Sequence, residues 1–181
     1  MTSHRVDATG REVVIEMPSV QGMVQIADQT LNSTAASIDF QNIPQTYNHL
    51  KLLCFLKGSA NDWHGIRFNN DTAANYGSVW MSGVNSSAGA GTTPGAAYGY
   101  VGLHGSAGTI AASTEIMIPN YKDGATLRRS WLAYNVDLAY VGAIIAGGSW
   151  NSTAAINRIT LIPIAGGTFS AGSRVTLHGI T

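Results

Sequence analysis

The residues of this chain that could do chemistry are its histidines, its carboxylates and its tryptophans. No two of the histidines stand at the spacing of a metal-binding pair, and no carboxylate lies at a matching offset. The histidines are His4, His49, His64, His104 and His178. Their spacing predicts no metal site.

Paired carboxylates could act as general acid and base, but only if the fold brings two of them together. Turns or strand edges account for most of the acidic candidates, which are Asp39, Asp62, Asp71, Glu115, Asp123 and Asp137. The chain has no Gly-x-Ser-x-Gly nucleophile elbow, and no lysine follows Gly89-Ala90-Gly91 to make it a phosphate-binding loop. We therefore expect a protein that is not an enzyme and that binds no cofactor. An enzyme acting on polysaccharide stays open only because β-sandwiches host such activities.

Two tryptophans, Trp63 and Trp150, are adjacent to predicted loops. An indole ring at the surface could stack on a sugar, whereas such residues more often fill cores and subunit contacts. Both interpretations stay open. Trp63 and Trp150 are the two candidates for a glycan-binding platform.

The composition limits the classes of partner. Charged residues make up only 11% of the 181 residues, against about 25% in an ordinary soluble domain. Such a surface suits permanent assembly, because little charge repulsion keeps copies apart. The formal net charge is zero, and a nucleic-acid partner, which needs clustered Lys and Arg, is not expected. No stretch approaches the roughly 18 apolar residues of a membrane span and none resembles a secretory signal, so we expect a soluble protein.

The first 22 residues differ from the rest because they hold a quarter of all acidic and basic residues. Val13-Val14-Ile15 could pair as a strand against a neighbour, and Pro18 and Gly22 would break the chain just before the core. We predict an extended N-terminal arm over residues 1–22 and one domain over residues 23–181. The residues expected to contact a partner are Arg5, Arg11, Val13, Val14 and Ile15.

The rest of the chain reads as short strands without a convincing amphipathic helix. Expected strands cover residues 23–31, 35–41, 49–57, 65–69, 78–83, 115–121, 125–134 and 137–147, and Gly147-Gly148 is expected to turn. The segment 49–57, which holds the single Cys54, could be a strand or a helix; its length and the following Gly58-Ser59 favour a strand. Asp123-Gly124 predicts a tight hairpin turn. Residues 83–111 are expected to form a Gly-rich loop, with one possible strand at 98–101.

The chain ends on two apolar segments, residues 156–163 and 173–180, joined by a Gly-rich turn. A terminal strand needs a partner for its backbone groups, so this pair is expected to close the fold. Together the strands predict an all-β protein, an antiparallel two-sheet sandwich that is jelly-roll-like.

Three segments carry a resemblance to a known group of proteins. They are residues 36–52 (Ala-Ser-Ile-Asp-Phe-Gln-Asn-Ile-Pro-Gln-Thr-Tyr-Asn-His-Leu-Lys-Leu), residues 66–71 with Asn75-Tyr76, and the ending 172–180. They resemble tailed-bacteriophage virion structural proteins of the small β-sandwich type. The resemblance implies a β-sandwich virion component that commonly assembles as a trimer, and it transfers no catalytic residue.

The resemblance covers both capsid decoration (cement) proteins and parts of tail fibres. We expect a non-enzymatic decoration protein that stabilises the shell, with the arm contacting the major capsid protein or neighbouring subunits. Its location would be the virion, assembled in the host cytoplasm. The alternative is a tail-fibre or receptor-binding domain that recognises host-surface glycans through Trp63 and Trp150.

Overall fold

The computed structural model describes residues 2–6, 12–16, 22–60, 62–105, 111–122, 128–137, 139 and 141–181, with the backbone alone for the first two segments. The described residues form strands and no helix. The strands are β1 (Thr2–Val6), β2 (Glu12–Glu16), β3 (Met23–Thr30), β4 (Ile38–Phe40), β5 (His49–Leu56), β6 (Asp62–Phe68), β7 (Tyr76–Val84), β8 (Ser87–Ala96), β9 (Gly99–His104), β10 (Ala112–Ile118), β11 (Arg129–Asp137), β12 (Gly142–Trp150), β13 (Ile159–Pro163) and β14 (Arg174–Ile180).

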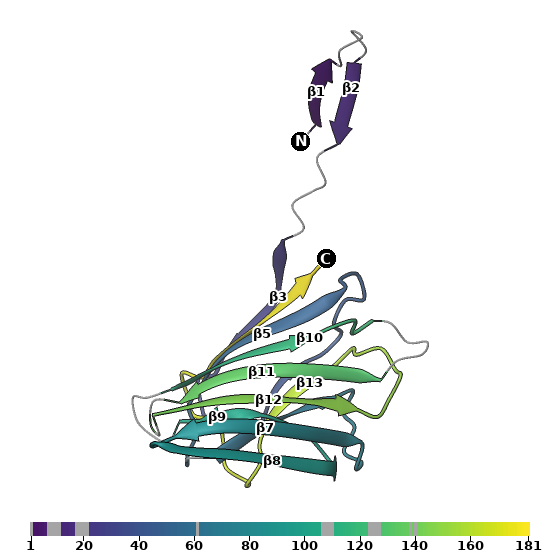
Figure 1. Cartoon of the computed structure of the whole chain (residues 1–181). Helices are drawn as coiled ribbons and strands as arrows, with labels where there is room; N and C mark the ends of the chain where they lie inside the picture. The colour runs from purple at the N-terminus through teal and green to yellow at the C-terminus, as the bar shows by residue number, and fades with distance from the viewer. Residues whose placement is uncertain are drawn as a thin grey trace.

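Twelve of these strands form two sheets that pack face to face as a sandwich. The larger sheet has eight strands in the order β3-β14-β5-β10-β11-β12-β7-β8, and the smaller has four in the order β4-β13-β6-β9. In Figure 1 the strands of the larger sheet follow one another from β3 to β8. Neighbouring strands in both sheets are antiparallel. The predicted all-β, antiparallel two-sheet sandwich is confirmed, while the jelly-roll pattern stays a prediction.

The core lies between the two sheets and follows the two-residue period of the strands. In β11 burial alternates strictly, with Trp131 and Ala133 inside and Leu132 and Tyr134 outside. The smaller sheet contributes residues such as Phe68, which is fully buried. Each such large side chain stabilises the fold by roughly 1.5–3 kcal/mol relative to exposure. The sandwich is therefore held together mainly by apolar burial.

The turn after β6 fastens one end of the sandwich. Asn69 has a positive φ of 51°, which asparagine tolerates better than most residues. Its Oδ1 accepts hydrogen bonds from the backbone N–H groups of Asn157 (2.9 Å) and Arg158 (3.2 Å), and its Nδ2 donates to the carbonyl of Ala155 at 2.7 Å. This asparagine therefore ties the β6–β7 turn to the segment that enters β13.

The Gly-rich segment differs from its prediction as a loop. Most of residues 83–111 belong to β8, which pairs with β7, and to β9, which pairs with β6. Small residues suffice in β8 because it is the edge strand of its sheet and has a single strand partner. Gly147 and Gly148, expected to turn, lie inside β12. Pattern-based prediction misses such strands because they carry few large side chains.

The two C-terminal strands exist but do not pair with each other as predicted. β13 belongs to the four-stranded sheet, whereas β14 lies between β3 and β5 in the eight-stranded sheet. The Gly-rich segment between them therefore crosses from one sheet to the other. Gly166 and Gly172 take positive φ values of 85° and 82° there, a conformation that favours glycine.

The hairpin predicted around Asp123-Gly124 is confirmed as the antiparallel pair β10–β11. Its strands end further from the turn than predicted, with β10 ending at Ile118 and β11 beginning at Arg129. Asp123 and Gly124 themselves lie outside the described residues. The segment 49–57, left open between strand and helix, forms the strand β5, as its length and the following Gly58-Ser59 favour, and Cys54 is buried in it.

The predicted strand at 13–15 is found as β2, and its partner is β1 of the same chain. Val13 lies opposite Arg5, Val14 opposite His4 and Ile15 opposite Ser3. Pairing within the chain satisfies the strand without the neighbour that the sequence suggested. Arg11 lies outside the described residues, and the roles of Arg5, Arg11, Val13, Val14 and Ile15 as partner contacts stay predictions.

Candidate functional site

The outer face of the eight-stranded sheet carries many of the exposed large apolar side chains of the described residues. One row crosses six neighbouring strands in register, and its residues are Leu53, Glu115, Tyr134, Ile145, Met81 and Ala90. Tyr134 is 50% exposed and Met81 is 58% exposed. We call this surface, from β5 to β8, the outer face.

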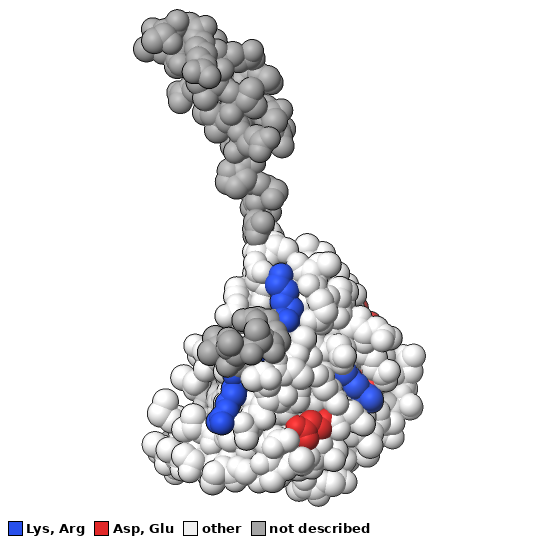
Figure 2. All heavy atoms as spheres, turned by 90° about the vertical axis from the view of Figure 1, so that its right-hand side faces the viewer, with Lys and Arg blue, Asp and Glu red and all other residues white. Residues whose placement is uncertain are grey.

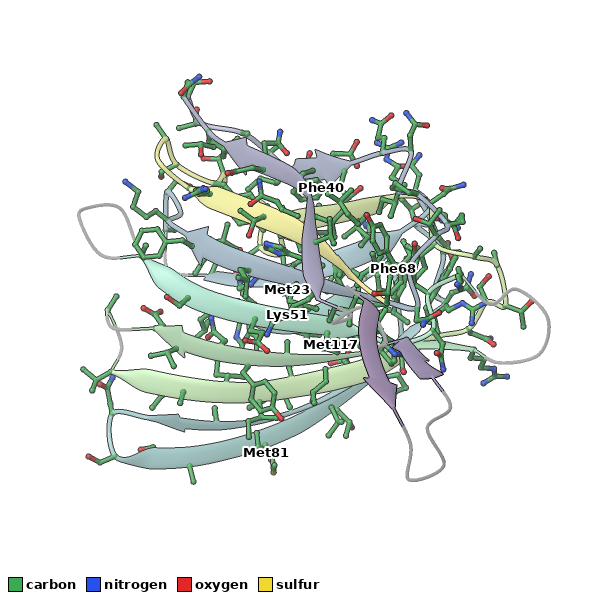
Figure 3. All side chains as sticks on the ribbon, turned by 90° about the horizontal axis from the view of Figure 1, so that it is seen from above. Met23, Phe40, Lys51, Phe68, Met81 and Met117 are labelled. Atoms are coloured by element: carbon green, nitrogen blue, oxygen red, sulfur yellow. The ribbon has the colours of Figure 1, made fainter. Side chains whose placement is uncertain are left out.

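The rows on either side of the first continue the same character. Phe55, Val136 and Ala143 share one of them, and Lys51, Met117, Leu132 and Val79 share the other. Figure 3 shows Met81 on the side of the larger sheet away from Phe40, which belongs to the smaller sheet. The outer face is thus apolar over several strands and faces away from the core.

The few charges on this face are paired within the chain. Lys51 Nζ lies 2.8 Å from Glu115 Oε1. Near β3, Arg174 forms two hydrogen bonds with the Asp28 carboxylate, of 2.9 and 2.5 Å, and they lower the pKa of Asp28. Figure 2 shows that Lys, Arg, Asp and Glu are also few and scattered on another side of the molecule. Paired charges leave little net repulsion against a second uncharged surface.

A shallow hollow of about 860 Å³ lies on the outer face. Its lining includes Leu53, Phe55, Tyr134, Val136 and Ile145. Carboxylate, guanidinium and imidazole groups also border it, from Glu115, Arg174 and His178. The face is therefore not flat and can receive protruding side chains.

The exposed apolar residues of the outer face lie on neighbouring strands and form one surface, and the area of that surface can be estimated. Six strands at a spacing of about 4.8 Å and five residues at about 3.4 Å each give a footprint of about 490 Å². Continuous apolar patches beyond a few hundred Å² are rare on monomers and mark interaction sites. We therefore treat the outer face as the candidate functional site.

The two tryptophans proposed as loop aromatics have different surroundings. Trp150 is the last residue of β12 and is only 3% exposed. It packs against Phe68 and Tyr76 with ring centroids 5.6 and 6.3 Å away. Of the two interpretations left open for Trp150, the structure shows core packing, since its ring is buried among these aromatic residues and is not open to a sugar.

Trp63 lies inside β6 and not in a loop, and its side chain is half-buried. It contacts the half-buried Trp80 and Tyr100, and it also packs against the edge of the core. The structure thus separates the two residues that the sequence placed in one class.

The interior holds a pair of histidines, His64 and His104, both fully buried, with ring centroids 5.9 Å apart. His64 Nε2 lies 3.2 Å from the Thr114 hydroxyl, whereas both nitrogens of His104 lack a partner among the described residues. Burial holds the pKa of His64 well below its ordinary value of 6.5, and repulsion from His104 adds to this. Burial also lowers the pKa of His104. This pair therefore favours the neutral state inside the fold.

Metal-binding geometry is absent from the part of the chain that the structure describes. No group of three or more His, Cys, Asp or Glu is arranged there to hold a metal ion. None of the described residues forms a helix long and apolar enough to cross a membrane.

The sequence reasoning did not single out the outer face, although a signal for it exists. β11 has large apolar residues at both parities, with Trp131 facing inward and Leu132, Tyr134 and Val136 facing outward. A strand that is apolar on both sides is typical of a sheet covered on both faces. Only one side of β11 is covered by the other sheet of this chain.

Comparisons of the chain with protein-family models, with curated proteins and with solved structures found no match.

Proposed function

We propose that this protein is a non-enzymatic structural protein of a tailed-bacteriophage virion, and specifically a capsid decoration protein that stabilises the shell. The observation that carries the proposal is the outer face of the eight-stranded sheet, which is apolar and exposed. A protein that works alone in water gains nothing from such a surface, whereas a subunit of a permanent assembly needs one.

The occupant that we propose for the outer face is another copy of this chain, in a trimer. Two features favour a copy over an unrelated charged partner. The charges on and beside the face are already paired internally, as Lys51 with Glu115 on the face and Arg174 with Asp28 beside it. The footprint is also of the order of the roughly 800 Å² of accessible surface that each partner gives to a standard interface, once the relief of the side chains is added.

The segments that resemble virion proteins have structural roles in this fold, which supports a structural function for the protein. Asn69 and Asp71 hold the turn after β6, and Tyr76 accepts a hydrogen bond from the backbone N–H of Phe68 at 2.8 Å. The ending 172–180 supplies β14, an inner strand of the larger sheet. These residues specify the sandwich and leave partner binding to other surfaces.

In this proposal the N-terminal arm makes the contact between the protein and the capsid shell. Residues 1–22, with Arg5, Arg11 and Val13-Val14-Ile15, would contact the major capsid protein. A protein that binds only the assembled shell stabilises it by RT ln(1 + [L]/Kd), which is about 2.7 kcal/mol when its free concentration is 100 times Kd.

The subunit contact is tested by measuring the molar mass with light scattering during gel filtration. We expect a trimer for the wild type and a monomer for Tyr134→Lys and Met81→Lys, because each buries a charge in the contact. Thr46→Lys, which adds the same charge at an exposed position outside the outer face, should remain a trimer. A wild type that stays monomeric at tens of micromolar would contradict the proposal.

The location is tested on intact particles by electron microscopy with a label on the C-terminus. Density over the shell supports a decoration protein, and density confined to the tail rejects it.

A chain lacking residues 1–22 should lose shell binding and keep the thermal unfolding transition of the domain. Full retention of binding would reject the role of the arm.

The alternative, a domain that recognises host-surface glycans, has one observation in its favour. Trp63 is half-buried beside other surface aromatics, whereas Trp150 is buried and is dropped from this role. A shell protein and a glycan-binding protein are separable by experiment, and the aromatic surface can be tested by itself.

A further inference from the structure

A chain of four aromatic rings runs across β6, β7 and the start of β9, apart from the outer face. Trp63 lies 5.1 Å from Trp80 and 5.4 Å from Tyr100, and Tyr100 lies 5.6 Å from Tyr98, measured between ring centroids. Neighbouring rings are inclined by 50° to 81°, so they do not cover one another as a parallel stack. All four side chains remain partly exposed.

Trp63 and Trp80 pack against the edge of the core, and the aromatic cluster inside the core is made of other residues. That cluster comprises Phe68, Tyr76, Trp131 and Trp150, and none of them is more than 3% exposed. None of the described ring pairs joins the two clusters. The four rings therefore contribute in part to the edge of the core and still present part of their surface to solvent.

The edge strand β8 is shaped around Trp80. A Cβ atom at Gly91 would lie 2.6 Å from Cζ2 of the Trp80 ring, and one at Gly89 would lie 3.5 Å from Cζ3. Contacts below 3.0 Å do not occur for real Cβ atoms, so Gly91 has to lack one. The glycine at position 91 thus gives the indole room to lie against the backbone of β8.

Fixed polar groups surround the aromatic chain. The Asp62 carboxylate accepts hydrogen bonds from the backbone N–H groups of Trp63 and Ala165, both at 2.7 Å. Arg67 Nε donates to the carbonyl of Ala97 at 3.0 Å, which leaves the remaining guanidinium N–H groups for a ligand. Within the described part of the chain, the indole N–H groups of Trp63 and Trp80 donate to no acceptor.

The charges near Tyr98 are of both signs. Asp62 and Arg67 both act on the Tyr98 hydroxyl, in opposite directions, and burial raises its pKa. The Tyr98 hydroxyl is protonated at neutral pH with or without this shift, and it shares a hydrogen bond with Tyr100 that also raises its pKa. A surface with one acid and one base at its border offers no net attraction to a charged ligand.

We infer that Trp63, Trp80, Tyr98 and Tyr100 form a binding surface for an uncharged saccharide chain. A sugar ring presents apolar C–H groups on its faces and hydroxyl groups on its edge. Aromatic rings with polar tips match that pattern, because the ring covers the apolar face while N–H and O–H groups bond the hydroxyls. This site goes beyond shell stabilisation, which does not use it.

The test uses the full chain on an array of neutral oligosaccharides built from hexoses, N-acetylhexosamines and deoxyhexoses, followed by calorimetric titration of the strongest binder. We expect binding by the wild type and at least a tenfold loss of affinity in Trp63→Leu and Trp80→Leu. Tyr98→Phe, which removes only a hydroxyl, should weaken binding about threefold, as expected for one hydrogen bond. This milder variant covers the case in which a tryptophan variant fails to fold.

Tyr134→Ala is the matched control, because it removes an exposed aromatic residue from the outer face. It should bind the sugar as the wild type does. The inference is overturned if the wild type binds none of the oligosaccharides at millimolar concentration. It is also overturned if Tyr98→Phe and the folded tryptophan variants bind unchanged, or if Tyr134→Ala loses binding to the same extent. None of these outcomes bears on the oligomeric state, so failure here is distinct from failure of the proposed function.

Discussion

The Asp71 carboxylate accepts a hydrogen bond from the indole N–H of Trp150, with 2.7 Å between Oδ2 and Nε1. The same carboxylate accepts from Asn75 Nδ2 at 2.9 Å and from the backbone N–H of Ala73 at 2.8 Å. The Trp150 ring in turn stacks on Tyr76, inclined by 17°. One acidic residue therefore joins the turn between β6 and β7 to the end of β12.

Replacing this carboxylate should destabilise the fold. Asp71→Ala leaves the Trp150 N–H without its acceptor and removes two bonds that hold the turn. We expect the free energy of unfolding to fall by about 1–3 kcal/mol, measured by urea denaturation. Asp28→Ala is the control, because its carboxylate bonds Arg174 on the exposed surface, where solvent screens an ion pair and it contributes little to stability. Equal losses in the two variants would argue against a special role for Asp71.

Most of the fold could be predicted because burial leaves a period in the sequence. β5 and β11 were found from their apolar residues, and the sandwich follows from the number of short strands. β8 was missed because an edge strand of Ser, Ala, Gly and Thr has no buried face to mark it. The separation of β13 and β14 into different sheets was also missed, since a glycine-rich connection has the same composition in a hairpin and in a crossing.

The candidate sites were less predictable than the fold. Trp63 and Trp150 both precede or follow turns in the sequence, yet only Trp63 remains partly exposed. Which of them points inward depends on strand parity and on the length of β12, and a local pattern does not fix either. Trp80 gave no signal by itself, because its role depends on Gly91 in the next strand.

We expect that Gly148 tolerates no side chain, whereas Gly83, another strand glycine, does. A Cβ atom at Gly148 would lie 2.1 Å from the carbonyl oxygen of Gly77 and 2.6 Å from the Trp131 ring. We expect Gly148→Ala to lower the free energy of unfolding by about 3 kcal/mol, the upper end for overpacking. Gly83→Ala meets nothing within 4 Å and should be neutral or slightly stabilising. Thermal unfolding of both variants checks this, and similar midpoints would refute the steric argument.

Acid should destabilise the protein through His64 and His104. Both have a pKa below the ordinary value of 6.5, mainly because burial disfavours the charged ring. Above pH 6.5 both rings are neutral in the folded and the unfolded chain, so they add no pH dependence. As the pH falls below 6.5, the two histidines become protonated in the unfolded chain but stay neutral in the folded chain. The free energy of unfolding then falls by up to about 1.4 kcal/mol per pH unit for each histidine.

The acid effect is checked by urea denaturation between pH 7.5 and pH 5, a range chosen to span the ordinary histidine pKa of about 6.5. The charged groups that act on His104 are Asp62 and Asp137, and both favour its protonation, so the larger part of the slope is expected from His64. His64→Gln should be less stable at pH 7.5 and should show a smaller slope. An unchanged slope in this variant would mean that other groups, such as the paired carboxylates, cause the acid sensitivity.

The thiol of Cys54 should be unreactive in the folded protein. Its side chain is only 5% exposed and faces the core from β5, and burial raises the pKa of the thiol, so little thiolate forms near neutral pH. Reaction with a thiol-specific disulfide reagent at pH 8 should therefore proceed no faster than the chain opens, and it should become immediate in concentrated urea.

Phe55→Cys in a Cys54→Ala background is the matched control, because position 55 is 51% exposed on the outer face. That variant should react at once as a monomer and slowly when the outer face is covered by another copy. Immediate labelling of native Cys54 would show that β5 is less firmly held than its place in the middle of the larger sheet requires.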